Sequence, residues 1–140
     1  MLEQFWEVYV SDIAASERFY CQALGLTTIR RQEDYAVLAA GPVRVHLCPA
    51  DDAPDDLSPV VGRIGNGVEF CFVVSDVVGA YRRASRSGYP ILEHLTDQDW
   101  GKTDFRLRDP DGAYIRITTP RSGPGLQPSE AAPPPGAPEP

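Results

Sequence analysis

Few residues of this 140-residue sequence could carry acid–base or covalent chemistry. His46 has a side chain that can titrate near neutral pH, and Cys71 offers a thiol that could act as a nucleophile with His46 as its base. The sequence contains no Gly-rich phosphate loop and no Cys-x-x-Cys, His-Glu-x-x-His or Gly-x-Ser-x-Gly motif. The sequence therefore offers no established motif for covalent catalysis. We expect His46 to be a hydrogen-bonded residue of a pocket.

Aromatic residues are the second group with a chemical use, because their faces stack on flat ligands and attract cations. The candidates are Phe5, Tyr9, Trp100, Phe105 and Tyr114. We expect Phe105 to be core, whereas Tyr9 and Tyr114 could serve either the core or a ligand. Trp100 follows a polar stretch that includes Asp97 and Asp99, so its ring has no apolar stripe to join. This set would suit a flat, cationic guest.

The elements that must position these residues occur twice along the chain. Alternating apolar residues run into Val-Ser-Asp at residues 10–12 and again at 74–76, and helical periodicity follows each time. Asp12 and Asp76 are predicted helix N-caps. The helices are expected to stop at Gly25 and Gly88, before strands at about 26–32, 35–40 and 43–49, and at 90–94, 103–108 and 113–119. Each half therefore reads as a βαβββ module.

This pattern predicts an α+β fold in which two βαβββ modules, at about 4–49 and 67–119, form a curved mixed sheet around a small-molecule pocket. Residues 50–66 form the linker within a single domain, 1–119. Eight of the fourteen prolines lie between positions 120 and 140, where Leu126 is the only large apolar residue. We expect this tail to be disordered.

Composition limits the compartment and the partners. The three cysteines, Cys21, Cys48 and Cys71, are an odd number within apolar periodic segments, so we expect buried free thiols and a reducing, cytoplasmic location. The sequence has no apolar run long enough to span a membrane. A formal net charge of −7 disfavours nucleic acid and anionic membranes as partners. A small molecule is the expected partner.

The arrangement resembles the vicinal oxygen chelate superfamily, which includes glyoxalase I, extradiol dioxygenases, and fosfomycin- and bleomycin-resistance proteins. The resemblance covers about residues 4–119. It rests on the doubled Val-Ser-Asp, Ser-x-x-Phe-Tyr at 16–20, Leu-Gly-Leu at 24–26, Trp100-Gly101 and Asp-Pro-Asp-Gly at 109–112. In the bleomycin-resistance branch, a similar Trp-Gly segment helps to form a drug groove at a dimer interface. The resemblance therefore implies a homodimer.

Metal-using members of this superfamily take their ligands from the first and last strands of each module. Counting back from Asp12 and Asp76, and along the last strands, places Phe5, His46, Glu69 and Arg116 in the four ligand positions. Phe5 has no lone pair and Arg116 carries a permanent charge, so only His46 and Glu69 suit a divalent ion. Glu7 would be a distant substitute for Phe5. We expect no metal and no cofactor, with Glu69 and Arg116 forming an ion pair instead.

The favoured function is a small-molecule binding protein of the bleomycin-resistance type, which sequesters an aromatic or cationic antibiotic-like compound without metal. The expected ligand-binding residues are Phe5, Glu7, Tyr9, His46, Glu69, Asp99, Trp100, Tyr114 and Arg116. The alternative is a lyase, isomerase or dioxygenase of the same fold. Such an enzyme would use His46 and Glu69 as catalytic residues, either without metal or with a divalent ion held by His46, Glu69 and Glu7.

Overall fold

The computed structural model describes residues 3–54, 67–99 and 101–120. The first half contains β1 (Trp6–Val10), α1 (Ile13–Gln22), β2 (Thr27–Gln32), β3 (Tyr35–Ala40), β4 (Val43–Pro49) and the short 3₁₀ helix η1 (Ala50–Asp52). The second half contains β5 (Glu69–Val73), α2 (Val77–Arg86), β6 (Ile91–Asp97), β7 (Thr103–Arg108) and β8 (Tyr114–Thr118). The predicted fold class, two βαβββ modules, is confirmed.

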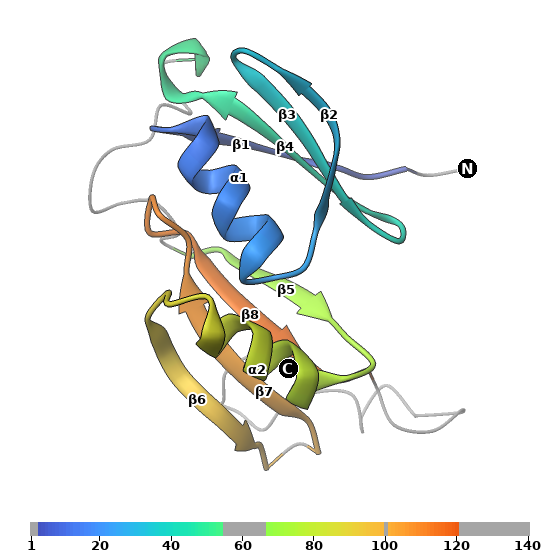
Figure 1. The fold of residues 1–140 in the computed structure, drawn as a ribbon. Helices are drawn as coiled ribbons and strands as arrows, with labels where there is room; N and C mark the ends of the chain where they lie inside the picture. The colour runs from blue at the N-terminus through green and yellow to red at the C-terminus, as the bar shows by residue number, and fades with distance from the viewer. Residues whose placement is uncertain (1–2, 55–66, 100, 121–140) are drawn as a thin grey trace.

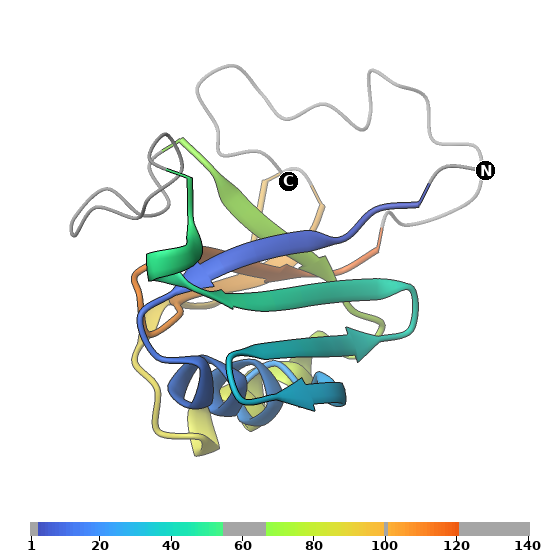
Figure 2. The ribbon, with the colours of Figure 1, turned by 90° about the horizontal axis from the view of Figure 1, so that it is seen from above.

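The strands form two four-stranded mixed sheets, ordered β1-β4-β3-β2 and β5-β8-β7-β6. In both, the first strand of the module pairs in parallel with the last, and the other neighbours are antiparallel. Each helix covers one face of its own sheet, and α1 and α2 lie on the same side of the molecule (Figure 1). Turning the molecule by 90° shows the strands of the first sheet in succession (Figure 2).

The helix boundaries follow from the residues predicted to set them. Oδ1 of Asp12 accepts a hydrogen bond from the amide of Ala15 at 3.0 Å, and Oδ1 of Asp76 accepts one from Gly79 at 2.9 Å. These N-cap bonds satisfy amides that the helix itself leaves unpaired. After the helices, Gly25 has φ +79° and Gly88 has φ +84°, a conformation that favours glycine.

The core lies between each sheet and its helix and is continuous across the two halves. The predicted alternation is confirmed, because Val8, Val10, Phe70 and Phe72 pack into this core. Phe105 is buried, as expected. Phe19 of α1 meets the ring of Tyr89 from the second half edge-on, with 4.9 Å between the ring centroids. The opposite face of each sheet remains for ligands.

The prediction for the cysteines was partly wrong. All three are free thiols, but only Cys48 is buried, whereas Cys21 is half-buried and Cys71 is exposed. Cys71 lies on β5 with the parity of Glu69, so its side chain belongs to the face that α2 does not cover. The expected burial of Cys71 was wrong because Cys71 shares this uncovered face with Glu69 and Val73, whereas Phe70 and Phe72 on the opposite parity pack into the core.

The expected disorder of residues 120–140 and most of the expected linker fall outside the described residues. Neither α1 nor α2, the two α-helices of the described ranges, has the length and apolar character of a membrane-spanning helix.

Candidate functional site

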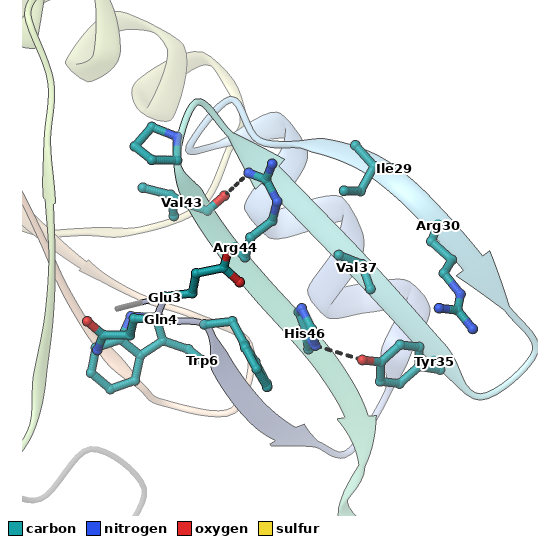
Figure 3. A pocket seen from close by; sticks show the side chains of 12 residues that line it. Glu3, Gln4, Trp6, Ile29, Arg30, Tyr35, Val37, Val43, Arg44 and His46 are labelled. Carbon is teal, nitrogen blue, oxygen red and sulfur yellow. Dashed lines mark hydrogen bonds between the residues drawn. The ribbon is translucent and has the colours of Figure 1, made fainter. Parts of the chain in front are cut away.

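A groove of about 910 Å³ lies on the face of the first sheet that α1 does not cover (Figure 3). The residues that line it all come from the first half of the chain: Glu3, Gln4, Phe5, Trp6, Ile29, Arg30, Tyr35, Val37, Pro42, Val43, Arg44 and His46. Three of its large apolar side chains are unusually accessible, since Phe5, Trp6 and Ile29 are 53%, 45% and 57% exposed. Exposed apolar groups gathered in one concavity are typical of a binding surface.

His46 is held at the centre of this groove from two sides. The ring of Phe5 stacks on the imidazole with 4.3 Å between centroids and 13° between planes. On the other side, 2.7 Å separates Oη of Tyr35 from Nδ1 of His46, which is a hydrogen bond (Figure 3). This bond occupies Nδ1, so Nε2 is the ring nitrogen that remains for a ligand.

The protonation of Tyr35 supports this arrangement. Burial raises the pKa of the Tyr35 phenol above its usual value of 10.0, and the nearby Cys48 and Glu7 raise it further, whereas Arg30 lowers it in part. The phenol therefore keeps its proton at neutral pH and can take part in the bond to His46. His46 is therefore a partly buried side chain that lines the groove and is held by Phe5 and Tyr35.

A second hollow of about 410 Å³ continues along the same face and shares Arg30 and Tyr35 with the groove. Tyr9 and Asp52 line it, so the tyrosine that could have been core instead faces the open side. Burial, followed by the charges of Glu7, Cys48 and Asp52, raises the pKa of Tyr9. Glu7 pairs with His46 in the register of β1 and β4 and is exposed, but it lines neither hollow.

The remaining predicted site residues lie on the second sheet. Nε of Arg116 is 3.5 Å from Oε1 of Glu69, so the expected ion pair is present. The closer partner is one that the sequence reasoning missed: Nε of Arg106 donates to the same oxygen at 2.8 Å. Nη1 of Arg106 also donates to Glu93 at 2.6 Å. The period-two run Asp104, Arg106, Arg108 was the available signal.

The other residues predicted for the second half are spread out. Tyr114 lies under the guanidinium of Arg108, 5.5 Å from its ring centroid. Asp99 is exposed and lines none of these hollows. Trp100 lies outside the described residues. Among the contacts of the described residues, none joins Phe5 or His46 to Glu69 or Arg116, so a single pocket built from all four stays a prediction.

These side chains do not supply the set of ligands that a metal-dependent relative would need. Phe5 covers the imidazole with an aromatic face, and Arg106 and Arg116 both lie against Glu69 where a cation would have to bind. Within the described ranges, no three His, Cys, Asp or Glu side chains come together as a metal site. The donor chemistry present is that of ion pairs and stacking.

Comparison with known proteins agrees with this architecture. Residues 4–117 match the family described as the Glyoxalase/Bleomycin resistance protein/Dioxygenase superfamily. The chain is 32% identical to bleomycin resistance proteins of Geobacillus stearothermophilus and Staphylococcus aureus, over 82% of this chain and 94% of theirs.

Solved structures show the same fold at lower identity. TioX from Micromonospora sp. ML1 superposes with a TM-score of 0.71 at 22% identity, over 85% of this chain and 98% of that one. A glyoxalase-related enzyme from Fulvimarina pelagi gives a TM-score of 0.68 at 18% identity, over 85% and 89% of the two chains. The doubled βαβββ architecture and the matches along residues 4–117 show that this chain belongs to the Glyoxalase/Bleomycin resistance protein/Dioxygenase superfamily.

Proposed function

We propose that the chain binds a small, antibiotic-like molecule in the groove of the first sheet and acts by sequestering it. The observation that carries this proposal is the stack of Phe5 on His46 inside an open concavity whose apolar side chains are half exposed. Ligand sites combine such apolar faces with a few placed polar groups, here His46, Tyr35 and Arg30. The similarity to bleomycin resistance proteins supports the same class of function.

The composition of the groove favours a flat guest with cationic groups. Phe5, Trp6 and Tyr35 offer aromatic faces, which attract both flat rings and cations. Glu3 lines the groove together with Arg30 and Arg44, whereas Asp34 and Asp52 line the adjoining hollow, so the cationic groups of the guest would lie toward that hollow. The net charge of −7 would also draw a cation toward the protein.

We propose binding without metal, because the residues in the family's ligand positions are an aromatic ring, an imidazole and an ion pair. The enzyme alternative, in which His46 and Glu69 exchange protons, has less support within one chain. The two side chains lie on different sheets, and within the described ranges their hydrogen bonds and ion pairs are to other residues.

The proposal includes a homodimer and a cytoplasmic location. Within one chain, the groove is lined by the first half alone, so a second copy could supply the opposite wall. Sedimentation of the purified chain would test this, and a monomer at micromolar concentration would contradict it. The cytoplasm is proposed because three free thiols persist best in a reducing compartment.

Binding of bleomycin, the compound in the name of these relatives, tests the proposed function. Titration should change tryptophan fluorescence, since Trp6 lines the groove, and should raise the melting temperature. We expect Phe5→Ala to weaken binding about tenfold, because it removes the exposed aromatic anchor. Val78→Ala is the matched control, since Val78 is also an exposed apolar residue, 45% accessible, but lies in α2 and does not line this groove.

Two outcomes would count against the proposal. One is that neither bleomycin nor a panel of cationic glycopeptides and flat aromatic compounds changes the fluorescence or the melting temperature. The other is that Phe5→Ala and Val78→Ala weaken binding equally, which would place the ligand elsewhere.

A further inference from the structure

A buried polar cluster occupies the face of the second sheet that α2 does not cover. Its four members are Asp104 and Arg106 on β7 and Arg116 and Thr118 on β8, and their exposed fractions are 1%, 3%, 1% and 2%. Arg106 is the direct cross-strand neighbour of Arg116, and Asp104 that of Thr118. All four share one parity, so their side chains form two adjacent rows.

Several polar atoms of this cluster have no hydrogen-bond partner in the described part of the chain. The groups without a hydrogen bond are Nη2 of Arg106, Nη1 of Arg116, Oδ2 of Asp104, Oγ1 of Thr118 and Nε of Arg116, which has only its 3.5 Å ion pair with Glu69. An unpaired buried polar atom is costly, and native proteins rarely leave one without a partner. Five such atoms in two neighbouring rows indicate a binding site, where a molecule outside the described chain completes the hydrogen bonds.

The charges of the cluster indicate which kind of ligand group would complete these hydrogen bonds. Burial lowers the pKa of the Arg106 guanidinium, but its bonds to Glu69 and Glu93 outweigh this, so the net pKa is raised and the cation is retained. Two guanidinium groups already face two carboxylates, those of Glu69 and Glu93, and Oδ1 of the neighbouring Asp104 accepts from Nε2 of Gln98 at 2.7 Å. A further anion would add unbalanced negative charge to a buried site. The cluster lacks hydrogen-bond partners rather than charge.

The arginine row presents donors, and the Asp104–Thr118 row presents acceptors. A carboxamide can bind both rows, because its carbonyl oxygen has two lone pairs that accept from the arginines and its N–H donates to the acceptors. The rows are about 7 Å apart along the strands. Two hydrogen bonds of about 2.9 Å, joined by the short O-to-N distance of an amide, span a similar length.

We propose that this cluster is a binding site for a neutral amide, with the carbonyl oxygen on Arg106 and Arg116 and the N–H on Oδ2 of Asp104. The ligand would reach it past Cys71, which is exposed and whose Sγ accepts from Nη2 of Arg116 at 3.2 Å. The site lies on the other sheet from the groove, and it stands whether or not bleomycin binds there.

Three small molecules that share the CH₃–C=O group separate the possibilities: acetamide has a donor and an acceptor, N,N-dimethylacetamide has only the acceptor, and acetate is an anion. Each is titrated into the full-length ¹⁵N-labelled chain at constant ionic strength, and the arginine Nε–H resonances are followed. Acetamide should shift the resonances of Arg106 and Arg116 and saturate at about tens of millimolar, which is well within the binding free energy per non-hydrogen atom that the best small ligands reach. Arg108, exposed at the end of the same strand, should stay unshifted.

Asp104→Asn tests the donor half of the site, because it replaces Oδ2 by a group that donates. It should weaken acetamide binding about tenfold and leave dimethylacetamide binding unchanged. If acetate shifts the two arginines more than acetamide does, the site binds anions and the proposal is wrong. If no compound shifts them, the proposal is also wrong. Both of these outcomes are measured on the wild-type chain, so they do not depend on whether the variant folds.

Discussion

Oη of Tyr20 donates a 2.9 Å hydrogen bond to Oδ2 of Asp109, and this bond links the two halves of the chain across 89 positions of sequence. Tyr20 belongs to α1, whereas Asp109 begins the turn between β7 and β8. The other carboxylate oxygen, Oδ1, accepts from the amides of Asp111 and Ala113 at 3.0 and 2.8 Å. Both side chains are buried, so the junction depends on a satisfied polar network as well as on apolar contact.

Removing the phenol oxygen should destabilise this junction. Tyr20→Phe leaves Oδ2 of Asp109 buried without a donor, and we expect a loss of about 1–3 kcal/mol in the free energy of unfolding, measured with urea. Tyr81→Phe is the matched control, since Oη of Tyr81 bonds Nδ1 of His94 at 2.6 Å on the surface. That variant should change stability by about 0.5 kcal/mol or less. Equal losses would show that burial does not set the cost.

Asp109 should make the stability depend on pH. Burial raises its pKa above the usual 3.8, although the amide of Ala113, the Tyr20 hydroxyl and the amide of Asp111 each lower it in part. A carboxyl group whose pKa is higher in the folded state favours folding at low pH, and this contribution is lost as pH rises through the folded pKa. Asp109→Asn should therefore become more stable relative to the wild type as pH rises from about 3.8 toward neutral. Urea unfolding at several pH values measures the difference, and the opposite trend would mean that the hydrogen bonds outweigh burial.

The helix ends offer a paired test of backbone geometry. Gly25→Ala and Gly88→Ala both place a side chain at positive φ, which should cost about 1 kcal/mol each. At Gly25, an added Cβ would also come within 2.5 Å of Nη1 of Arg83, whereas nothing lies within 4 Å of a Cβ at Gly88. We expect a larger loss at Gly25 only if Arg83 cannot move aside. Gly25→Ala combined with Arg83→Ala separates the two causes, because the double variant should then cost no more than Gly88→Ala does.

Divalent metal should neither bind stoichiometrically nor stabilise the protein. The expectation rests on Phe5 stacked over His46 and on the guanidinium of Arg106 against Glu69. Elemental analysis of the purified chain, and its melting temperature with Mn²⁺, Ni²⁺ or Zn²⁺, measure this. A stoichiometric ion that disappears in Glu69→Gln would contradict binding without metal.

Much of the fold was predictable because its signals are local. The N-cap role of Asp12 and Asp76 needs only three following residues, and the alternation of β5 decides which of its side chains share a face. The ion pair between Glu69 and Arg116 followed from parity together with the family resemblance, which places the first and last strands of a module side by side. The sequence by itself therefore determined the elements, their order and the face to which each side chain belongs.

Only the tertiary structure decided which side chains contact one another on those faces. Period-two alternation assigned Phe5 and His46 to an open face, but it did not show that their rings stack or that Tyr35 holds Nδ1. It also did not show that Arg106 is closer than Arg116 to Glu69. Such contacts depend on the register between strands distant in sequence and on the packing of α1 against the second half. The strand register and this packing depend on interactions summed over the whole core, which no short segment of sequence contains.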